Sequence, residues 1–568
     1  MAMLQENRLE ILNKWKSNPN LDSEIRKELD SLNDEELFDA FYCDLEFGTG
    51  GMRGVIGAGT NRLNIYTLRT ANYGFGKFLL ARAKHPSCVI AYDSRRKSLD
   101  FAKESARVLA SLGVKVYLFN KITPTPELSF AVRYLKATGG IVITASHNPA
   151  KYNGYKIYDE TGCQLVPDLA EIVIKNIASA PDPLTMTLLS YDDLLKNKLV
   201  TIVGDKIDKQ YLKCVKGVAL HLDQNKDNFK VVFTSLHGTS AYLGQILLTE
   251  VGFNFIPVKE QMVPDSEFST VALPNPEDKN AFNLAIKYAK ESDADICIAT
   301  DPDADRVGLA VKYDNDYVLL TGNQTGALLI NYLCNEKKIK KTGVVFNTIV
   351  TSPLGAKIAE SHGMETFSTL TGFKYIGEQA TLLEKSKDKQ FFFGYEESYG
   401  YVVKDFVRDK DSLQALLLCS DMACFYKNQG KNLIEVLNDI YNKYNYYGED
   451  LVNIALTGAS GSEKIKRILN YFRYQDLNND KLVPVRKEDY ELREAISYPS
   501  LEKSPLTLPK SNVVKYILND DSFVVLRPSG TEPKMKVYVS VNRKTKEEAL
   551  ARVKEIKDTI LEVVNSIE

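Results

Sequence analysis

The pattern of apolar and polar positions repeats three times along the chain. In the first repeat, an apolar, β-branched run at 88–93 precedes an amphipathic segment at 101–112, and a second apolar run follows at 114–119. Strand, helix and strand in this order are typical of a βαβ unit, and Gly113 is the glycine that commonly ends a helix. The same order returns at 230–234, 243–251 and 253–258, and again at 343–350, 353–361 and 364–368. The pattern therefore predicts three similar α/β units.

Each unit is followed by a further apolar strand that ends in a polar loop. The loops are Thr144–Pro149, Asp301–Arg306 and Gly394–Ser398. Equivalent strands of repeated α/β units end at equivalent edges of their sheets, which is where open sheets bind ligands. We therefore expect the three loops to surround one cleft.

The two ends of the chain do not follow the repeat. Before Asp44, charged residues alternate with apolar ones at helical spacing, as at Leu9, Leu12 and Trp15. This spacing predicts an N-terminal helical segment, whose role the sequence does not indicate. Near the other end, runs at 523–526 and 536–541 predict strands, and the segment 545–567 predicts a closing helix.

Together these elements predict an α/β protein of four domains. Three are repeated α/β domains, and the last is a C-terminal α+β domain. A chain of 568 residues exceeds what a single hydrophobic core supports, in agreement with several domains. The predicted domains are 1–203 with the helical segment and the Ser146 loop, 204–322 with the aspartate loop, 323–447, and 448–568.

Composition narrows the possible partners. Acidic and basic residues nearly cancel, at 74 and 72, and no long basic run could neutralise a row of nucleic-acid phosphates. No apolar stretch is long enough to cross a bilayer. The eight cysteines lack CxxC pairs and several lie in apolar runs, as expected of reduced core residues. We expect a cytoplasmic monomer or weak homodimer, with neither nucleic-acid nor membrane partners.

Ser146 is the first candidate for chemistry. It follows a buried strand and precedes a turn favoured by Asn148 and Pro149, so we expect its hydroxyl to be exposed at a strand tip. An ordinary polar turn is the alternative. A Ser-His-Asp hydrolase fits poorly, because Ser146 and His147 are adjacent on an extended chain and point apart, and because no GxSxG motif surrounds the serine.

Asp301, Asp303 and Asp305 are candidate metal ligands. In extended backbone, alternate side chains fall on one side, so the three carboxylates can share one hard cation, with Mg²⁺ expected. A solvated acidic turn is the alternative. An EF-hand is excluded, because Arg306 and Lys312 stand where that loop needs Gly and Glu. A haloacid-dehalogenase-type nucleophilic aspartate is disfavoured by the continuation Ala-Asp-Arg but stays open.

Three further segments carry weaker signals. The loop 527–534 combines arginine, hydroxyls, glycine and lysine, an inventory that suits a phosphate dianion but also occurs in plain turns. Glu396, Glu397 and Ser398 could accept from sugar hydroxyls, although such acidic pairs are usually solvated. The glycine-rich run 48–54 carries Arg53 where a dinucleotide loop needs its third glycine, so we interpret it as a phosphate-facing loop that delivers Arg53.

Five motifs in this order give the chain a family resemblance. They are Gly-Thr-Gly-Gly-Met-Arg (48–53), Thr-Ala-Ser-His-Asn-Pro (144–149), Asp-Pro-Asp-Ala-Asp-Arg (301–306), Gly-Tyr-Glu-Glu-Ser (394–398) and Arg-Pro-Ser-Gly-Thr-Glu-Pro-Lys (527–534). With them the chain resembles the α-D-phosphohexomutase family, in its phosphoglucomutase/phosphomannomutase branch, over nearly all of its length after the helical segment. The resemblance implies an isomerase that interconverts glucose 1-phosphate and glucose 6-phosphate, with Mg²⁺ as cofactor and glucose 1,6-bisphosphate as intermediate and activator.

The resemblance also implies that the four domains surround a central cleft, with mixed sheets in the three repeated α/β domains, and it implies roles for individual residues. Ser146 would carry the phosphate, and Asp301, Asp303 and Asp305 would bind Mg²⁺ together with an oxygen of the phosphoserine. Arg53, His147 and Lys156 would lie near the transferring phosphate, with either Lys156 or His147 as the proton acceptor. The residues expected to contact the sugar or its phosphates are Arg306, Thr371, Gly372, Lys374, Glu396, Ser398, Lys410, Arg527, Ser529, Gly530, Thr531 and Lys534.

One departure from the family pattern is Tyr395, which separates the glycine from Glu-Glu-Ser; we expect the roles of Glu396 and Ser398 to survive it. The Glu-Glu-Ser form resembles glucose-type members more than mannose-type ones. Phosphomannomutase, phosphopentomutase and glucose-1,6-bisphosphate synthase activities stay open as alternatives. A non-catalytic sugar-phosphate sensor is disfavoured, since a sensor does not need a nucleophile beside a metal.

Overall fold

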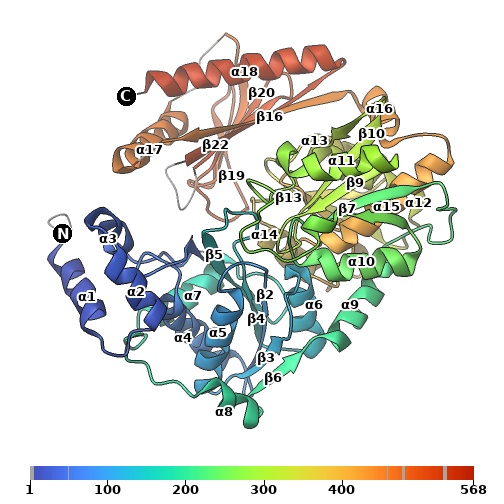
Figure 1. The fold of residues 1–568 in the computed structure, drawn as a ribbon. Coiled ribbons are helices and arrows are strands. Elements are labelled where there is room, and N and C mark those ends of the chain that lie inside the picture. The colour runs from blue at the N-terminus through green and yellow to red at the C-terminus, as the bar shows by residue number, and fades with distance from the viewer. Residues whose placement is uncertain are drawn as a thin grey trace. The chain divides into compact units, whose positions relative to one another are not determined.

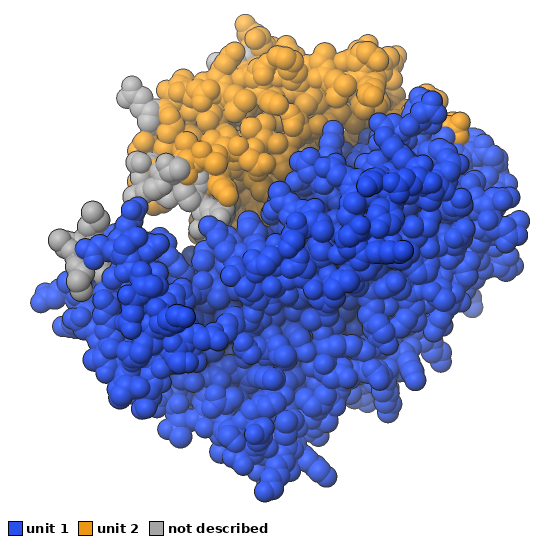
Figure 2. All heavy atoms as spheres, in the orientation of Figure 1, with its two compact units in different colours: residues 1–325, 336–344, 373–432 blue, residues 326–335, 345–372, 433–568 orange. Residues whose placement is uncertain are grey.

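The computed structural model describes residues 5–48, 50–456, 458–475, 477, 480–528 and 534–567 (Figure 1). The chain divides into two compact units. Unit 1 comprises Met1–Thr325, Glu336–Val344 and Phe373–Asn432, and unit 2 comprises Gly326–Asn335, Val345–Gly372 and Leu433–Glu568 (Figure 2).

The predicted N-terminal helical segment is confirmed. It consists of α1 (Glu6–Ser17), α2 (Ser23–Ser31) and α3 (Asp34–Phe41). Asp22 and Asn33 accept hydrogen bonds from the first backbone N–H groups of α2 and α3, which begins each helix with a side-chain cap. Trp15 packs edge-on against Phe41 and Tyr66, with ring centroids 5.5 and 5.1 Å apart. Since Tyr66 belongs to the next helix of the chain, these contacts join the segment to the first α/β sheet.

The first sheet is six-stranded and mixed, in the order β1-β5-β4-β2-β3-β6. Strand β2 pairs in parallel with β3 and β4, whereas β5 pairs antiparallel with β4 and β1. The elements are β1 (Gly51–Val55), α4 (Ile65–Arg82), β2 (Ser87–Tyr92), α5 (Ser98–Ser111), β3 (Lys115–Phe119), α6 (Thr125–Leu135), β4 (Gly139–Ile143), β5 (Tyr152–Asp159), α7 (Pro167–Ile177), α8 (Tyr191–Lys196) and β6 (Val200–Val203). The predicted first βαβ unit is confirmed.

The second sheet repeats this plan with five strands in the order β11-β10-β9-β7-β8. Strand β7 pairs in parallel with β8 and β9, and β10 runs antiparallel to both of its neighbours. The elements are α9 (Asp205–Lys216), β7 (Lys230–Thr234), α10 (Ser240–Val251), β8 (Asn254–Pro257), the 3₁₀ turns Lys259–Gln261 and Lys279–Phe282, α11 (Asn283–Ser292), β9 (Ile296–Thr300), β10 (Val307–Tyr313) and β11 (Asp316–Leu319). The second predicted unit is confirmed as well.

The third sheet has four strands in the order β13-β12-β14-β15. Its strands are β12 (Thr342–Thr348), β13 (Glu365–Thr369), β14 (Lys389–Glu396) and β15 (Gly400–Val402), and the neighbouring helices are α12 (Gly322–Glu336), α13 (Pro353–Ser361), α14 (Phe373–Leu383), α15 (Ser412–Asn428) and α16 (Leu433–Tyr444). Helix α13 has the predicted bounds, and β12 and β13 lie within two residues of the predicted strands.

The C-terminal domain is built on a seven-stranded sheet in the order β16-β22-β21-β20-β17-β18-β19, with antiparallel pairing throughout. Its elements are β16 (Tyr446–Ala455), α17 (Gly458–Tyr474), β17 (Pro484–Asp489), β18 (Glu494–Ser497), β19 (Glu502–Pro505), β20 (Val514–Leu518), β21 (Phe523–Pro528), β22 (Lys534–Arg543) and α18 (Lys546–Ser566). Phe472 of α17 and Ile556 of α18 share one apolar core with the sheet residues Tyr516 and Leu526. The predicted α+β domain and its closing helix are confirmed.

The glycine-rich run was predicted as a loop, and this is wrong for residues 51–55, which form the edge strand β1. The strand pairs antiparallel with β5, placing Gly51 opposite Lys156. Gly51 has φ +138°, and a Cβ there would lie 1.8 Å from the Tyr155 carbonyl oxygen, so only glycine permits this close pairing. Arg53 therefore projects from a strand rather than from a loop.

The three predicted domain boundaries, after residues 203, 322 and 447, stay predictions. None of the described helices is long and apolar enough to cross a membrane.

Candidate active site

Ser146 lies in a short loop directly after β4. Its backbone is left-handed, with φ +52°, and its N–H donates to the Thr144 hydroxyl at 2.8 Å. The Oγ atom lies 2.7 Å from Oδ2 of Asp301 and 3.0 Å from Nδ1 of His147. The expectation that the side chains of Ser146 and His147 point apart is therefore wrong, because the backbone at Ser146 is left-handed and not extended. The loop thus brings the serine of the first repeat to the aspartate loop of the second, as the sequence predicts for strand ends at equivalent edges.

The expected exposure of Ser146 is wrong. Only 3% of the residue is accessible, because the Asp301 carboxylate and the His147 ring cover its hydroxyl. Asp301 belongs to the second repeat and lies 155 residues further along the chain. Burial follows from the approach of the second domain, which the local sequence around Ser146 does not report.

Arg95 holds the Ser146 loop in place, a role that sequence reasoning missed. Its guanidinium donates to the carbonyl oxygens of Ser146 at 2.6 Å and of Pro149 and Tyr152 at 3.0 Å each. The ring of Phe268, from the second repeat, covers the guanidinium, with 4.9 Å between the ring centroid and Arg95 Cζ. A signal was present, since Arg95 follows the end of β2, the strand next to β4 in the sheet. The rule used for the other strand ends would have found it.

Asp301, Asp303 and Asp305, here called the acidic triad, converge just after β9. One oxygen of each lies within 4.8 Å of the others, and all three residues are buried. The route to convergence differs from the prediction: the segment is a turn with Ala304 at φ +59°, not an extended strand. Oδ1 of Asp301 accepts from the backbone N–H groups of Asp305 and Arg306 at 3.0 and 2.9 Å, which closes the turn.

The triad has the donor set and geometry of a cation site. Among the described residues, Oδ1 of Asp303 and Oδ1 of Asp305 are buried without a hydrogen-bond partner. Burial, followed by the charges of Asp305 and Asp303, raises the pKa of Asp301 well above its ordinary value. A hard divalent cation satisfies unpaired carboxylate oxygens and relieves this repulsion, so the residues fit such an ion.

Two lysines reach the triad from other segments. Nζ of Lys156, on β5, lies 2.8 Å from Asp303 and 3.4 Å from Asp305, and Nζ of Lys410 lies 3.1 Å from Asp305. Burial opposes ionisation of Asp303 and Asp305, but the ammonium groups outweigh it and lower the pKa of both carboxyls. The same pairs raise the pKa of Lys156 and Lys410 against the effect of burial.

The other predicted residues of the first two repeats also lie here. Arg53 donates to Oδ1 of Asn148, in the Ser146 loop, at 2.8 Å. The Arg306 guanidinium pairs with Glu277 and approaches Oδ1 of Asp305 at 4.0 Å. Burial, and then the charges of Arg306 and Arg53, lower the pKa of His147 well below its ordinary value. The site therefore concentrates positive groups beside the serine.

The third repeat contributes Glu396 and Lys410 to unit 1. Glu396 ends β14, is 6% exposed, and its charge helps to raise the pKa of Lys410 and Arg306 against burial. Ser398 follows in the half-buried turn before β15. The backbone carbonyl of Lys374, at the start of α14, accepts from the Cys163 thiol at 3.2 Å, while Thr371 and Gly372 belong to unit 2.

The predicted phosphate loop lies in unit 2. Arg527 is half-buried near the end of β21, and Lys534 is exposed at the start of β22. The predicted residues Ser529, Gly530 and Thr531 lie outside the described residues. The two flanking strands pair with Arg527 opposite Lys536, so both ends of the loop start from one antiparallel ladder.

Comparison with known proteins agrees with this arrangement. Residues 44–183, 209–314 and 321–444 match, in order, the alpha/beta/alpha domains I, II and III of phosphoglucomutase/phosphomannomutase. A phosphoglucomutase of Staphylococcus epidermidis is 40% identical over 513 residues, 89% of this chain and 92% of the relative. A phosphoglucomutase of Staphylococcus aureus strain MRSA252 is 38% identical over 526 residues, 92% of this chain and 94% of the relative.

Solved structures share the fold. Parafusin (phosphoglucomutase) from Paramecium, in its open form, matches with a TM-score of 0.69 and 18% identity, covering 92% of this chain and 95% of that one. A phosphoglucomutase/phosphomannomutase family protein from Burkholderia thailandensis gives a TM-score of 0.66 at 19% identity, with 92% and 97% covered.

The chain therefore belongs to the phosphoglucomutase/phosphomannomutase family. The family consists of mutases, isomerases that transfer phosphate between positions of a hexose. The resemblance carried by the five sequence motifs is thus confirmed.

Proposed function

We propose that the chain is a phosphoglucomutase that interconverts glucose 1-phosphate and glucose 6-phosphate, with Ser146 as the phosphate carrier. The main support is the 2.7 Å approach of the Ser146 hydroxyl to Asp301, within a buried group of carboxylates faced by two ammonium groups. Identity of 40% over 89% of the chain to a protein named phosphoglucomutase favours glucose as the sugar.

The proposed reaction has two mirrored transfers. In the first, the bond between phosphorus and Ser146 Oγ breaks while a bond forms from phosphorus to the free hydroxyl of the hexose monophosphate. The proton of that hydroxyl passes to His147 or Lys156, which stay open as alternatives. The resulting glucose 1,6-bisphosphate turns over and returns its other phosphate to Ser146 by the reverse steps, so it serves as both intermediate and activator.

Catalysis of phosphoryl transfer requires that the protein position the reacting groups and supply positive charge around the phosphoryl group. Mg²⁺ held by Asp301, Asp303, Asp305 and a phosphoserine oxygen would stabilise the charge on the transferring group. Arg53, beside the Ser146 loop, would add a guanidinium close to the reacting oxygen.

The remaining site residues would bind the substrate. Carboxylate, hydroxyl and ammonium groups suit sugar hydroxyls, and a guanidinium fork with hydroxyls and backbone N–H groups suits a phosphate. We assign Thr371, Gly372, Lys374, Glu396, Ser398 and Lys410 to the sugar, Arg306 to the phosphate near the triad, and Arg527, Ser529, Gly530, Thr531 and Lys534 to the distal phosphate. A cytoplasmic monomer or weak homodimer stays our expectation.

Ser146→Ala tests the proposal directly. Removing the oxygen that carries the phosphate should lower turnover of glucose 1-phosphate by several orders of magnitude. The thermal midpoint should change little, because loss of one hydrogen-bonding hydroxyl costs about 1 kcal/mol. Intact mass should show a phosphoryl group on the wild type, lost on incubation with substrate, and none on the variant.

Ser361→Ala, which removes a hydroxyl at the end of α13, is the matched control and should behave as wild type. A fully active Ser146→Ala enzyme would refute the assignment. Faster turnover of mannose 1-phosphate or ribose 1-phosphate than of glucose 1-phosphate would leave the phosphoserine assignment in place. It would show that the substrate contains a different sugar.

A further inference from the structure

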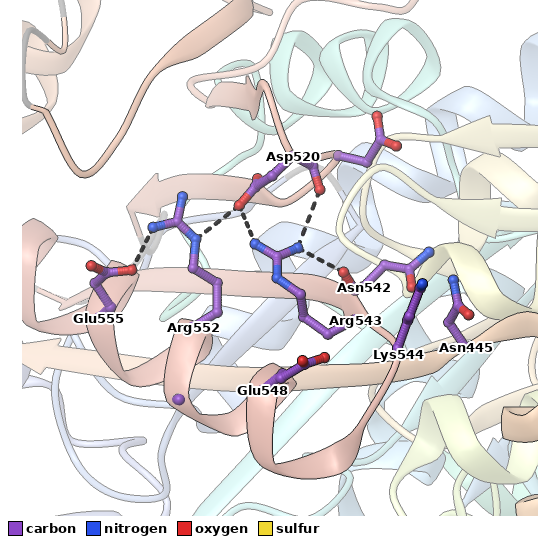
Figure 3. A pocket seen from close by; sticks show the side chains of 10 residues that line it. Asn445, Asp520, Asn542, Arg543, Lys544, Glu548, Arg552 and Glu555 are labelled. Carbon is purple, nitrogen blue, oxygen red and sulfur yellow. Dashed lines mark hydrogen bonds and ion pairs between the residues drawn. The ribbon is translucent and has the colours of Figure 1, made fainter.

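A hollow in unit 2 is a poor candidate for an anion site, although it contains Arg543 and Arg552 (Figure 3). Its volume is about 900 Å³, and it lies beside α18 and the end of β22. Both guanidinium groups pair with Asp520, and Arg552 also pairs with Glu555 at 2.6 Å. Because these charges are already neutralised, the hollow offers little to an anionic ligand.

A smaller cavity in unit 1 is a better candidate for a binding site. It has a volume of about 320 Å³ and lies between α1, α4 and the segment that leads into β1. Its walls are mostly apolar and include Ile11, Trp15, Leu45, Phe47, Met52 and Tyr66. Ligand pockets are typically cavities of about 300–1,000 Å³ lined by apolar and aromatic side chains, and this cavity matches that description.

The polar groups around this cavity define the ligand it suits. The Lys14 ammonium lies 2.5 Å from Asp182, and Asp44 pairs with Arg8 at 2.6 Å, so the charges at the rim cancel. The Thr60 hydroxyl donates to the Cys43 carbonyl at 2.7 Å and is occupied as well. What remains is apolar and aromatic surface, which favours an uncharged molecule containing aromatic rings.

Strand β1 is a wall shared by this cavity and the candidate active site. Met52 lines the cavity, and neighbouring side chains on a strand point to opposite faces, so Arg53 points away from the cavity and reaches Asn148. Gly54 packs against Leu45, another wall residue, since a Cβ at this glycine would lie 2.8 Å from Leu45 Cδ1. A ligand that displaces Met52 or Leu45 therefore shifts the residues on either side of Arg53.

We propose that this cavity binds an uncharged aromatic small molecule and that its occupancy acts on the active site through β1. Binding itself is independent of the proposed function, whereas an effect on turnover rests on it. The position of the site gives the N-terminal helices a role, because α1 supplies one wall and the family's α/β core supplies the others.

The chain contains a single tryptophan, Trp15, and it lines the cavity, so its fluorescence reports this site alone. The probe is N-phenyl-1-naphthylamine, an uncharged fluorophore that accepts energy from tryptophan. Titrated into the full chain, it should quench Trp15 emission saturably while its own emission rises. Absent or non-saturable quenching would overturn the proposal.

Filling the cavity should abolish binding. Thr70→Phe and Ala71→Leu each add bulk at the α4 wall, and either should remove the saturable quenching. Thr249→Phe, on the exposed side of α10, is the matched control and should keep it. Circular dichroism establishes that each variant is folded; should Thr70→Phe fail to fold, Ala71→Leu decides. Undiminished quenching in the folded filling variants would contradict the assigned site.

Coupling to β1 is measured by amide hydrogen exchange. Saturating probe should slow exchange in the peptide that contains residues 51–55 and leave the peptide of β9 unchanged. Unchanged exchange at 51–55 despite saturable binding would refute the coupling. Turnover of glucose 1-phosphate should change at least twofold with probe in the wild type and not in Thr70→Phe. Saturable binding with protected β1, in an enzyme that turns over no hexose phosphate, would refute the proposed function alone.

Discussion

Unit 1 buries two groups of acidic side chains and neutralises them in different ways. The acidic triad is faced by the ammonium groups of Lys156 and Lys410. The second group, here called the Glu127 group, consists of Glu127, Asp208 and Asp411. Burial, and then the charge of Asp208, raises the pKa of Glu127 well above its ordinary value, and burial raises the pKa of Asp411 to about 6.

The Glu127 group has one facing ammonium group, that of Lys121, which lies 2.5 Å from Asp208, and hydrogen bonds hold Asp411. Asp411 caps α15 by accepting from the N–H groups of Leu413 and Gln414 at 3.0 and 3.1 Å, and it accepts from the Tyr211 hydroxyl at 2.7 Å. Helix α6 serves both groups, since the Thr125 hydroxyl donates to Asp303 at 2.9 Å and Glu127 lies two residues further on. A buried carboxyl group can thus be stabilised either by protonation and hydrogen bonds or by facing cations. Only facing cations leave the carboxylate ionised and therefore able to bind a metal ion.

The largest expected effect comes from removing one charge of the acidic triad. Asp303→Asn should lower turnover more than about 100-fold, since even outer partners of metal ligands typically contribute 10–100-fold. Mg²⁺ titration followed by activity should show weaker binding. Glu127→Gln makes the same carboxyl-to-amide change in the Glu127 group and should stay within about twofold of wild type. Equal losses of turnover in the two variants would contradict the conclusion that only the acidic triad takes part in catalysis.

A smaller effect is expected from Arg95, which holds Ser146 against the triad. Arg95→Lys keeps the charge but cannot donate to several carbonyl oxygens at once. We expect kcat to fall by up to about 100-fold with little change in KM, because a misplacement of about 1 Å can cost that much. Arg96→Lys is the matched control, since Arg96 is half-exposed and pairs with Glu267 at 3.0 Å. A large change in KM with kcat preserved would show that Arg95 acts on binding instead.

The smallest expected effect concerns stability in the Glu127 group. Because burial raises the pKa of Asp411 to about 6 from 3.8, its stabilising contribution is complete below pH 3.8 and is lost as the pH rises through 6. The loss amounts to about 3 kcal/mol by linkage. Asp411→Asn does not titrate, so its thermal midpoint relative to wild type should rise between pH 4 and pH 7. A constant difference across this range would show that Asp411 stays ionised.

Much of the fold could be predicted from the sequence. Apolar runs of β-branched residues located β2, β7 and β12, and amphipathic spacing located α5, α10 and α13, because each pattern is local and repeats three times. The loops at Ser146 and Asp301 were found for the same reason, since a polar motif after a buried strand can be recognised without knowing its neighbours. The prediction of a loop for the glycine-rich segment was wrong, because the strand with which it pairs, β5, lies about a hundred residues further on.

The amino-acid sequence alone determined that Ser146 and the three aspartates follow buried strands and are candidates for the chemistry, since the hydrophobic pattern locates both strands. Only the tertiary structure decided that Ser146 is buried, that Arg95 holds its loop, and that Lys156 and Lys410 face the acidic triad. These contacts join segments far apart in the chain. Burial and electrostatic pairing depend on what approaches through space, and no local pattern encodes that approach.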